Sequence, residues 1–119
     1  MSLRDGVAVA APALAHDLKL QGIIIPTLSG TTARVICSYR PTAPLVAVST
    51  NTAVCRQLSL NWGVVPMTAT QSEYGNWDAL CRRIAKSCDL TRTGHNVLLV
   101  AGFSDDAGRN SPMLQVLNV

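Results

Sequence analysis

Continuous apolar runs alternate along the chain with segments whose apolar residues recur at helical spacing. The runs are short and rich in Ile, Val and Leu, which is typical of strands buried on both faces of a parallel sheet. The segments between them repeat apolar residues every three or four positions, as one face of a helix does. The expected elements are helix 6–18, strand 23–25, helix 33–39, strand 45–48, helix 52–61, strand 64–67, helix 77–88, strand 97–101 and strand 113–119.

Residues near the ends of these elements indicate how they begin and stop. Asp5 is expected to cap the first helix, and residues 49–51 supply a cap for the third. Pro12 lies inside the first helix, where it removes one hydrogen bond and predicts a kink. Pro66 lies inside a strand, which favours an edge position in the sheet.

The alternation of helices and strands predicts an α/β fold with three layers, α/β/α. Successive strands joined through a helix run parallel, and helices then cover both faces of the sheet. The last strand follows its predecessor without a helix and is expected to run antiparallel to it. We expect a single domain over residues 1–119, in which residues 1–3 are a candidate expression leader.

Composition narrows the possible classes of protein. The 119 residues carry a net charge of +3, with 14% charged, 48% hydrophobic and 4% aromatic residues. A disordered chain would show the opposite balance of charge and hydrophobicity, and a single-stranded nucleic-acid platform would need more aromatics among basic residues. No apolar run approaches the length of a membrane span. The low charge indicates that part of the apolar surface belongs to a partner.

Cysteines and histidines do not form a recognisable metal or catalytic pattern. The cysteines stand at positions 37, 55, 81 and 88, without a C-x-x-C pair. We interpret them as buried, reduced thiols of a cytoplasmic protein, because the chain start also lacks a signal peptide. His16 and His95 are isolated, so neither a zinc site nor a catalytic base is expected.

The strongest candidate site follows the first predicted strand, where a helix begins. Thr27, Ser29, Gly30, Thr31 and Thr32 place hydroxyl groups and a glycine at that point. Backbone N–H groups and the helix dipole at such a start can bind a phosphate. The segment is neither a Walker loop nor a dinucleotide fingerprint. An alternative interpretation is a capped helix start, with Ser29 or Thr31 as the cap.

A second candidate site is the polar segment between the last two predicted strands. Arg109, next to Gly108, can grip a phosphate. Asp105 and Asp106 argue against an anionic ligand, because like charges repel. A solvated hairpin loop is the alternative.

Several sequence blocks together resemble the C-terminal domain of pyruvate kinase. They cover nearly the whole chain in the order that the family shows. The blocks are Gly6-Val7-Ala8-Val9-Ala10-Ala11, Thr27-x-Ser29-Gly30-x-Thr32-Ala33-Arg34, Tyr39-Arg40-Pro41-x-Ala43-Pro44, Ala47-Val48-x-x-Asn51, Arg56-x-Leu58-x-Leu60-x-Trp62-Gly63-Val64-x-Pro66 and Gly94-x-x-Val97-Leu98-Leu99-Val100-Ala101-Gly102.

The resemblance implies a five-stranded sheet of order 3-2-1-4-5 with the last strand antiparallel. It implies a regulatory and oligomerisation domain that does no chemistry itself and needs no cofactor. The catalytic residues, Mg²⁺ and K⁺ would lie in a barrel domain of the same polypeptide. A phosphorylated effector, often a sugar phosphate, would bind at residues 27–32 and at the loop 103–111, which contains Gly108 and Arg109.

Two departures from the family pattern affect these expectations. Leu28 and Thr31 are uncharged where the family commonly has charged residues, and Asp105-Asp106 makes the second loop acidic. Residues 27–32 can still accept a phosphate monoester, but the departures argue against tight binding of fructose bisphosphate. Two other functions stay open: a ligand-free subunit-interaction module that uses the last strand, and a small enzyme acting on phosphorylated metabolites.

Overall fold

The chain forms alternating helices and strands in the predicted order. The computed structural model describes residues 3–27, 30–39, 43–60, 63–70, 76–87, 96–101 and 113–118. The elements are α1 (Leu3–Asp17), β1 (Ile23–Pro26), α2 (Thr31–Ser38), β2 (Leu45–Ser49), α3 (Thr52–Leu58), β3 (Val64–Thr68), α4 (Trp77–Ser87), β4 (Asn96–Ala101) and β5 (Met113–Asn118).

The strands form one five-stranded sheet of order β3-β2-β1-β4-β5, which is the order that the family resemblance implied. β1 pairs parallel with β2 and β4, and β2 pairs parallel with β3. β5 runs antiparallel to β4. Pro66 lies in β3, at the edge of the sheet, where its missing N–H removes no bond between two inner strands. The three-layer α/β/α architecture is therefore confirmed.

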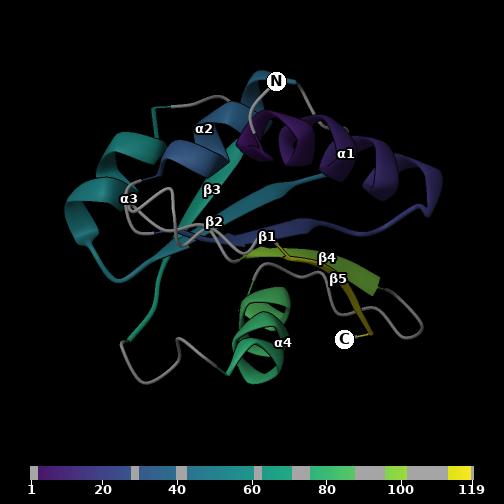
Figure 1. The fold of residues 1–119 in the computed structure, drawn as a ribbon. Helices are drawn as coiled ribbons and strands as arrows, with labels where there is room; N and C mark the ends of the chain where they lie inside the picture. Colours follow the sequence, from purple (N-terminus) through teal and green to yellow (C-terminus); the bar gives the residue numbers. More distant parts are fainter. Residues whose placement is uncertain are drawn as a thin grey trace.

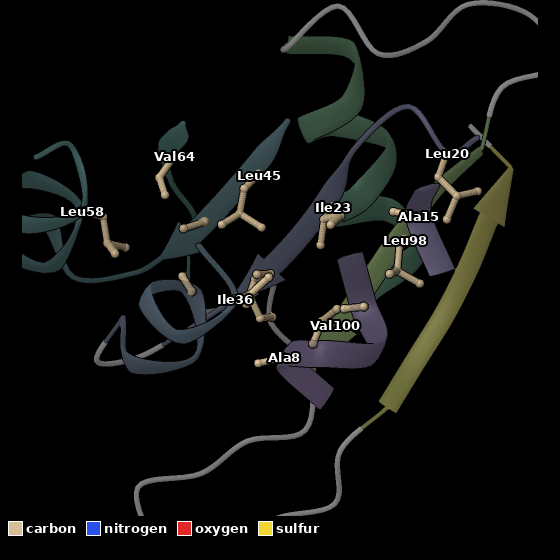
Figure 2. Packing of buried hydrophobic residues seen from close by; sticks show 14 of the residues in the cluster. Ala8, Ala15, Leu20, Ile23, Ile36, Leu45, Leu58, Val64, Leu98 and Val100 are labelled. Carbon is tan, nitrogen blue, oxygen red and sulfur yellow. The ribbon is translucent and has the colours of Figure 1, made fainter. Parts of the chain in front are cut away.

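Three helices cover one face of the sheet, and they bury one of two core clusters (Figure 1). Figure 2 shows Ala8 and Ala15 of α1 close to Leu98 and Val100 of β4, with Ile36 of α2 beside them. Small alanine side chains let α1 approach the sheet closely. The helix residues of this cluster with no more than 8% exposure are Ala8, Ala11, Ala15, Ala33, Ile36, Val54 and Leu58.

Of the described helices, α4 covers the opposite face (Figure 1). Its buried residues pack on strand residues that alternate with those of the first cluster, because successive side chains of a strand point to opposite faces. This second cluster consists of Ile24, Val46, Val48, Leu80, Cys81, Ile84, Ala85, Val97, Leu99 and Ala101. Arg82, Arg83 and Lys86 are exposed, as the helical spacing predicted.

The ends of two helices differ from the sequence expectation. α1 begins at Leu3, so Asp5 lies within the helix and is not its cap, and the helix continues through Pro12. Buried alanines on both sides of Pro12 fix the helix to the sheet, which outweighs one lost hydrogen bond. α3 ends at Leu58 rather than near residue 61, because the Leu60 N–H donates to Gln57 O and tightens the last turn.

Candidate functional site

The turn that leaves β1 is closed by hydrogen bonds from Thr27 and Gly30. The Thr27 N–H donates to the carbonyl oxygen of Val48 at 2.7 Å, which extends the β1–β2 pairing by one residue. The Gly30 N–H donates to Thr27 Oγ1 at 2.9 Å. Leu28 and Ser29 lie outside the described residues. The Thr27 hydroxyl therefore has a structural partner within the turn.

Gly30 begins α2 in a left-handed backbone conformation. Thr31 is the first residue of the helix, so Gly30 is the N-cap, with φ of 83° and ψ of −2°. The alternative in which Ser29 or Thr31 is the cap residue is therefore wrong. A glycine cap offers no side-chain acceptor to the amides of the first turn. The first turn of α2 also contains no acidic residue, so no side chain there offsets the positive end of the helix dipole.

The predicted site residues that the structure describes lie together at this turn. Thr27 and Thr32 are buried, with 8% and 4% of their surface exposed, whereas Thr31 is half-buried. Thr31 is thus the most accessible of these hydroxyls. Ser29, the remaining hydroxyl residue of the candidate site, lies outside the described residues.

This turn lies at the switch point of the sheet. β1 has β2 on one side and β4 on the other, and both neighbours run parallel to it. The chain leaves β1 toward α2 on one face, whereas β4 is reached through α4 on the other (Figure 1). Ligands of open α/β sheets bind at the carboxyl ends of the strands where connections diverge in this way.

The loop with Gly108 and Arg109 begins at the same edge of the sheet. β4 ends at Ala101, parallel to β1, so the chain leaves β4 on the side where Thr27 leaves β1. Gly108 and Arg109 themselves lie outside the described residues. The topology brings the start of this loop to the turn, and the second candidate site stays a prediction.

Arg34 is a feature of the site to which the sequence pattern assigned no role. It lies four residues after Gly30, and its Nη2 donates to Oε1 of Gln57 on α3 at 3.0 Å. The backbone N–H of Arg34 donates to the Gly30 carbonyl oxygen at 3.0 Å, which is the first hydrogen bond of the helix. The spacing of four from Gly30 was the available signal, because it places both residues on one face of α2.

Cys37, Cys55 and Cys81 are thiols rather than disulfides, as expected; Cys55 and Cys81 are buried, whereas Cys37 is only partly buried. Cys88 and His95 lie outside the described residues. Within the described ranges, no three His, Cys, Asp or Glu side chains gather as metal ligands would. No helix in those ranges has the length and apolar character needed to cross a membrane.

Comparisons with known proteins find relatives that match nearly the whole of this chain. The family model described as "Pyruvate kinase, alpha/beta domain" matches residues 5–117. A pyruvate kinase from Bacillus licheniformis is 38% identical over 115 residues, which cover 95% of this chain and 20% of the relative. One from Dictyostelium discoideum is 33% identical over 122 residues, covering 100% of this chain and 24% of the relative.

A solved structure shows the same fold. Pyruvate kinase of Cryptosporidium parvum in complex with ADP aligns with a TM-score of 0.85 and 24% identity, over 98% of this chain and 24% of that chain. The present chain thus spans between a fifth and a quarter of the length of these proteins. It belongs to the pyruvate kinase family and corresponds to the C-terminal alpha/beta domain of its members.

Proposed function

We propose that this chain is the regulatory and oligomerisation domain of a pyruvate kinase. The parent enzyme transfers a phosphate group from phosphoenolpyruvate to ADP in glycolysis, in the cytoplasm. The reaction, with its Mg²⁺ and K⁺, would take place in a catalytic barrel domain of the same polypeptide. The chain of residues 1–119 alone would be a single, non-catalytic unit that binds a phosphorylated effector and contacts other subunits.

The observation that carries the effector proposal is the start of α2 at the switch point of the sheet. A glycine cap, an uncompensated helix dipole and the half-buried Thr31 hydroxyl lie together there. Phosphate groups bind at helix starts through backbone N–H groups, hydroxyl donors and the dipole. Because Leu28 and Thr31 are uncharged, recognition relies on neutral donors, which suits a phosphate monoester. Arg109 of the following loop would add the cationic contact.

A titration with inorganic phosphate and with a hexose monophosphate tests the effector site. We expect amide resonances of residues 27–32 to shift, and the double variant Ser29→Ala/Thr31→Val to bind about tenfold or more weakly, because hydrogen bonds to a charged group are lost. Thr52→Val is the matched control, since Thr52 is the exposed first residue of α3 as Thr31 is the first of α2. Equal affinity of the double variant and the control would show that the turn serves only to start the helix.

An assay of the isolated chain tests its non-catalytic status. Phosphoenolpyruvate, ADP and Mg²⁺ are supplied with K⁺, and pyruvate is measured over time. We expect no pyruvate above the rate without protein, because the barrel that would hold the catalytic residues is not within these 119 residues. Pyruvate formation that depends on the amount of chain would disprove this part of the proposal.

Exposed apolar residues on β5 favour the second candidate, a subunit-interaction module. Leu114 and Val116 are 38% and 42% exposed. They pair with Val100 and Leu98, so they lie on the sheet face that α1 covers over β4. A second copy of the chain is the partner that this candidate predicts, with or without an effector.

A further inference from the structure

Gly30 lies directly against two apolar side chains of α3. A Cβ atom at Gly30 would meet Leu58 Cδ2 at 3.2 Å and Val54 Cγ1 at 3.3 Å. Leu58 has no exposed surface, and Val54 is 8% exposed. The glycine therefore lets the backbone at the start of α2 pack closely against α3. A larger residue at this position would force the two helices apart.

A polar contact joins the same two helix faces one turn further along. Arg34, four residues after Gly30, donates to Gln57 at 3.0 Å. Val54, Gln57 and Leu58 are spaced by three and four residues, so they share one face of α3. Two contacts thus hold α2 against α3: the packing of Gly30 on Val54 and Leu58, and the Arg34–Gln57 hydrogen bond. We call this pair of contacts the clamp.

α3 has its own attachments to the sheet, which do not involve α2. Asn51 caps it by accepting from the Ala53 N–H at 2.9 Å. The Cys55 thiol donates to the carbonyl oxygen of Met67 at 3.4 Å. The Cys55 sulfur also lies 4.0 Å from the Ser49 carbonyl oxygen, so α3 contacts both β2 and β3. α3 therefore serves as a fixed reference for the turn beside it.

We propose that α3 sets the position of Gly30 and the start of α2, with Gln57 and Leu58 as positioning residues. The clamp acts whether or not a ligand is present. Its consequence for effector binding rests on the proposed function: a turn released from α3 would present its donors less precisely and bind phosphate less tightly. Gln57 is exposed and accessible to substitution, whereas Leu58 belongs to the core.

Amide hydrogen exchange of the whole chain tests the clamp, with the Gly30 N–H as reporter because it donates to Thr27 Oγ1. We expect Gln57→Ala to speed exchange at Gly30 about threefold or more, while the amides between β1 and β2 exchange as before. Arg56→Ala is the matched control, an exposed neighbour on α3. Gln57→Glu should restore slow exchange, because a carboxylate oxygen still accepts from Arg34. Wild-type exchange at Gly30 in Gln57→Ala would overturn the proposal.

A titration of the same variants with inorganic phosphate gives the second measurement. We expect Gln57→Ala to bind phosphate about threefold or more weakly at an unchanged melting temperature, and Arg56→Ala to bind as the wild type does. If Gly30 exchanges faster in Gln57→Ala but the affinity for phosphate does not change, the positioning role for the site is wrong. If the wild type binds no phosphate, the effector site fails, and the exchange data alone decide the clamp.

Discussion

Two features of position 30, its backbone conformation and the close packing around it, require a glycine. Its φ of 83° lies in the left-handed region, where a Cβ atom adds strain, and a Cβ atom there would come within 3.3 Å of Leu58 and Val54. Gly63 has a similar φ of 85° but no atom within 4 Å of a built Cβ. Substitutions at Gly30 and Gly63 therefore separate the cost of backbone strain from the cost of crowding.

We expect Gly30→Ala to lower the free energy of unfolding more than Gly63→Ala does. Backbone strain costs each variant about 1–2 kcal/mol, and crowding against α3 adds about 1–3 kcal/mol at Gly30 alone. Urea unfolding followed by circular dichroism gives both values. Gly6→Ala, inside α1 with no neighbour within 4 Å of its Cβ, should be neutral or stabilising. Equal losses at Gly30 and Gly63 would show that α3 yields to the added methyl group.

The start of α2 shows why the turn that carries the candidate site could be located from sequence but not described in detail. Hydroxyl residues followed by a helical pattern indicated the correct turn, because polar side chains commonly precede a helix. The same preference led to Ser29 or Thr31 as the cap, whereas the structure uses Gly30. The cause is tertiary: Leu58 and Val54 come from a helix more than twenty residues later and require a glycine at the point of contact. No local pattern contains that information.

At the scale of single elements, α3 is short and depends on its cap. It has seven residues, and an isolated helix of that length is unstable in water. Asn51 accepts from the Ala53 N–H at 2.9 Å and so satisfies one of the first amides. Ser49 Oγ accepts from the Asn51 N–H at 3.1 Å and holds the cap residue in place.

Asn51→Ala is expected to destabilise the chain by about 1 kcal/mol, within the usual range of about 0.5–2 kcal/mol for a lost cap. Thermal or urea unfolding measures the loss. Asn51→Asp is the matched variant, because its carboxylate still accepts from Ala53 and also interacts favourably with the helix dipole. The cap has no energetic role if Asn51→Ala and Asn51→Asp are equally stable.

Element types were predictable because core positions dominate their patterns. The strand runs at 45–48 and 97–101 are continuous since both faces of β2 and β4 are covered by helices. Element ends were less predictable: α1 begins at Leu3 rather than at residue 6, and α3 stops at Leu58 rather than near residue 61. At both helices, packing against the sheet or a tightened last turn outweighed the local propensity of the residues.

At the scale of the whole molecule, the two faces of the sheet are covered unequally. α1, α2 and α3 cover one face and α4 the other, and β5 extends the sheet beyond β4 (Figure 1). The proposed effector site lies at the carboxyl ends of β1 and β4, apart from the apolar surface that Leu114 and Val116 form on β5. The regulatory and the assembly roles in the proposed function would therefore use different parts of the sheet.

The surface on β5 leads to a prediction about self-association. Edge strands with exposed apolar residues pair readily with other chains, and the β5 surface carries no charge that would prevent it. We expect the wild-type chain to associate as its concentration rises in sedimentation velocity experiments. Leu114→Lys/Val116→Lys should keep the chain monomeric, because two buried and unpaired charges would oppose the contact.

Leu60→Lys provides the matched control for this experiment. Leu60 is 86% exposed at the end of α3, so the variant adds a charge to an exposed leucine away from β5. We expect it to associate as the wild type does. If Leu60→Lys abolishes association as the β5 variant does, general surface hydrophobicity drives the contact and β5 has no specific role. A wild-type chain that stays monomeric at all concentrations would disprove the interaction module and leave the proposed effector site as the remaining candidate of the two.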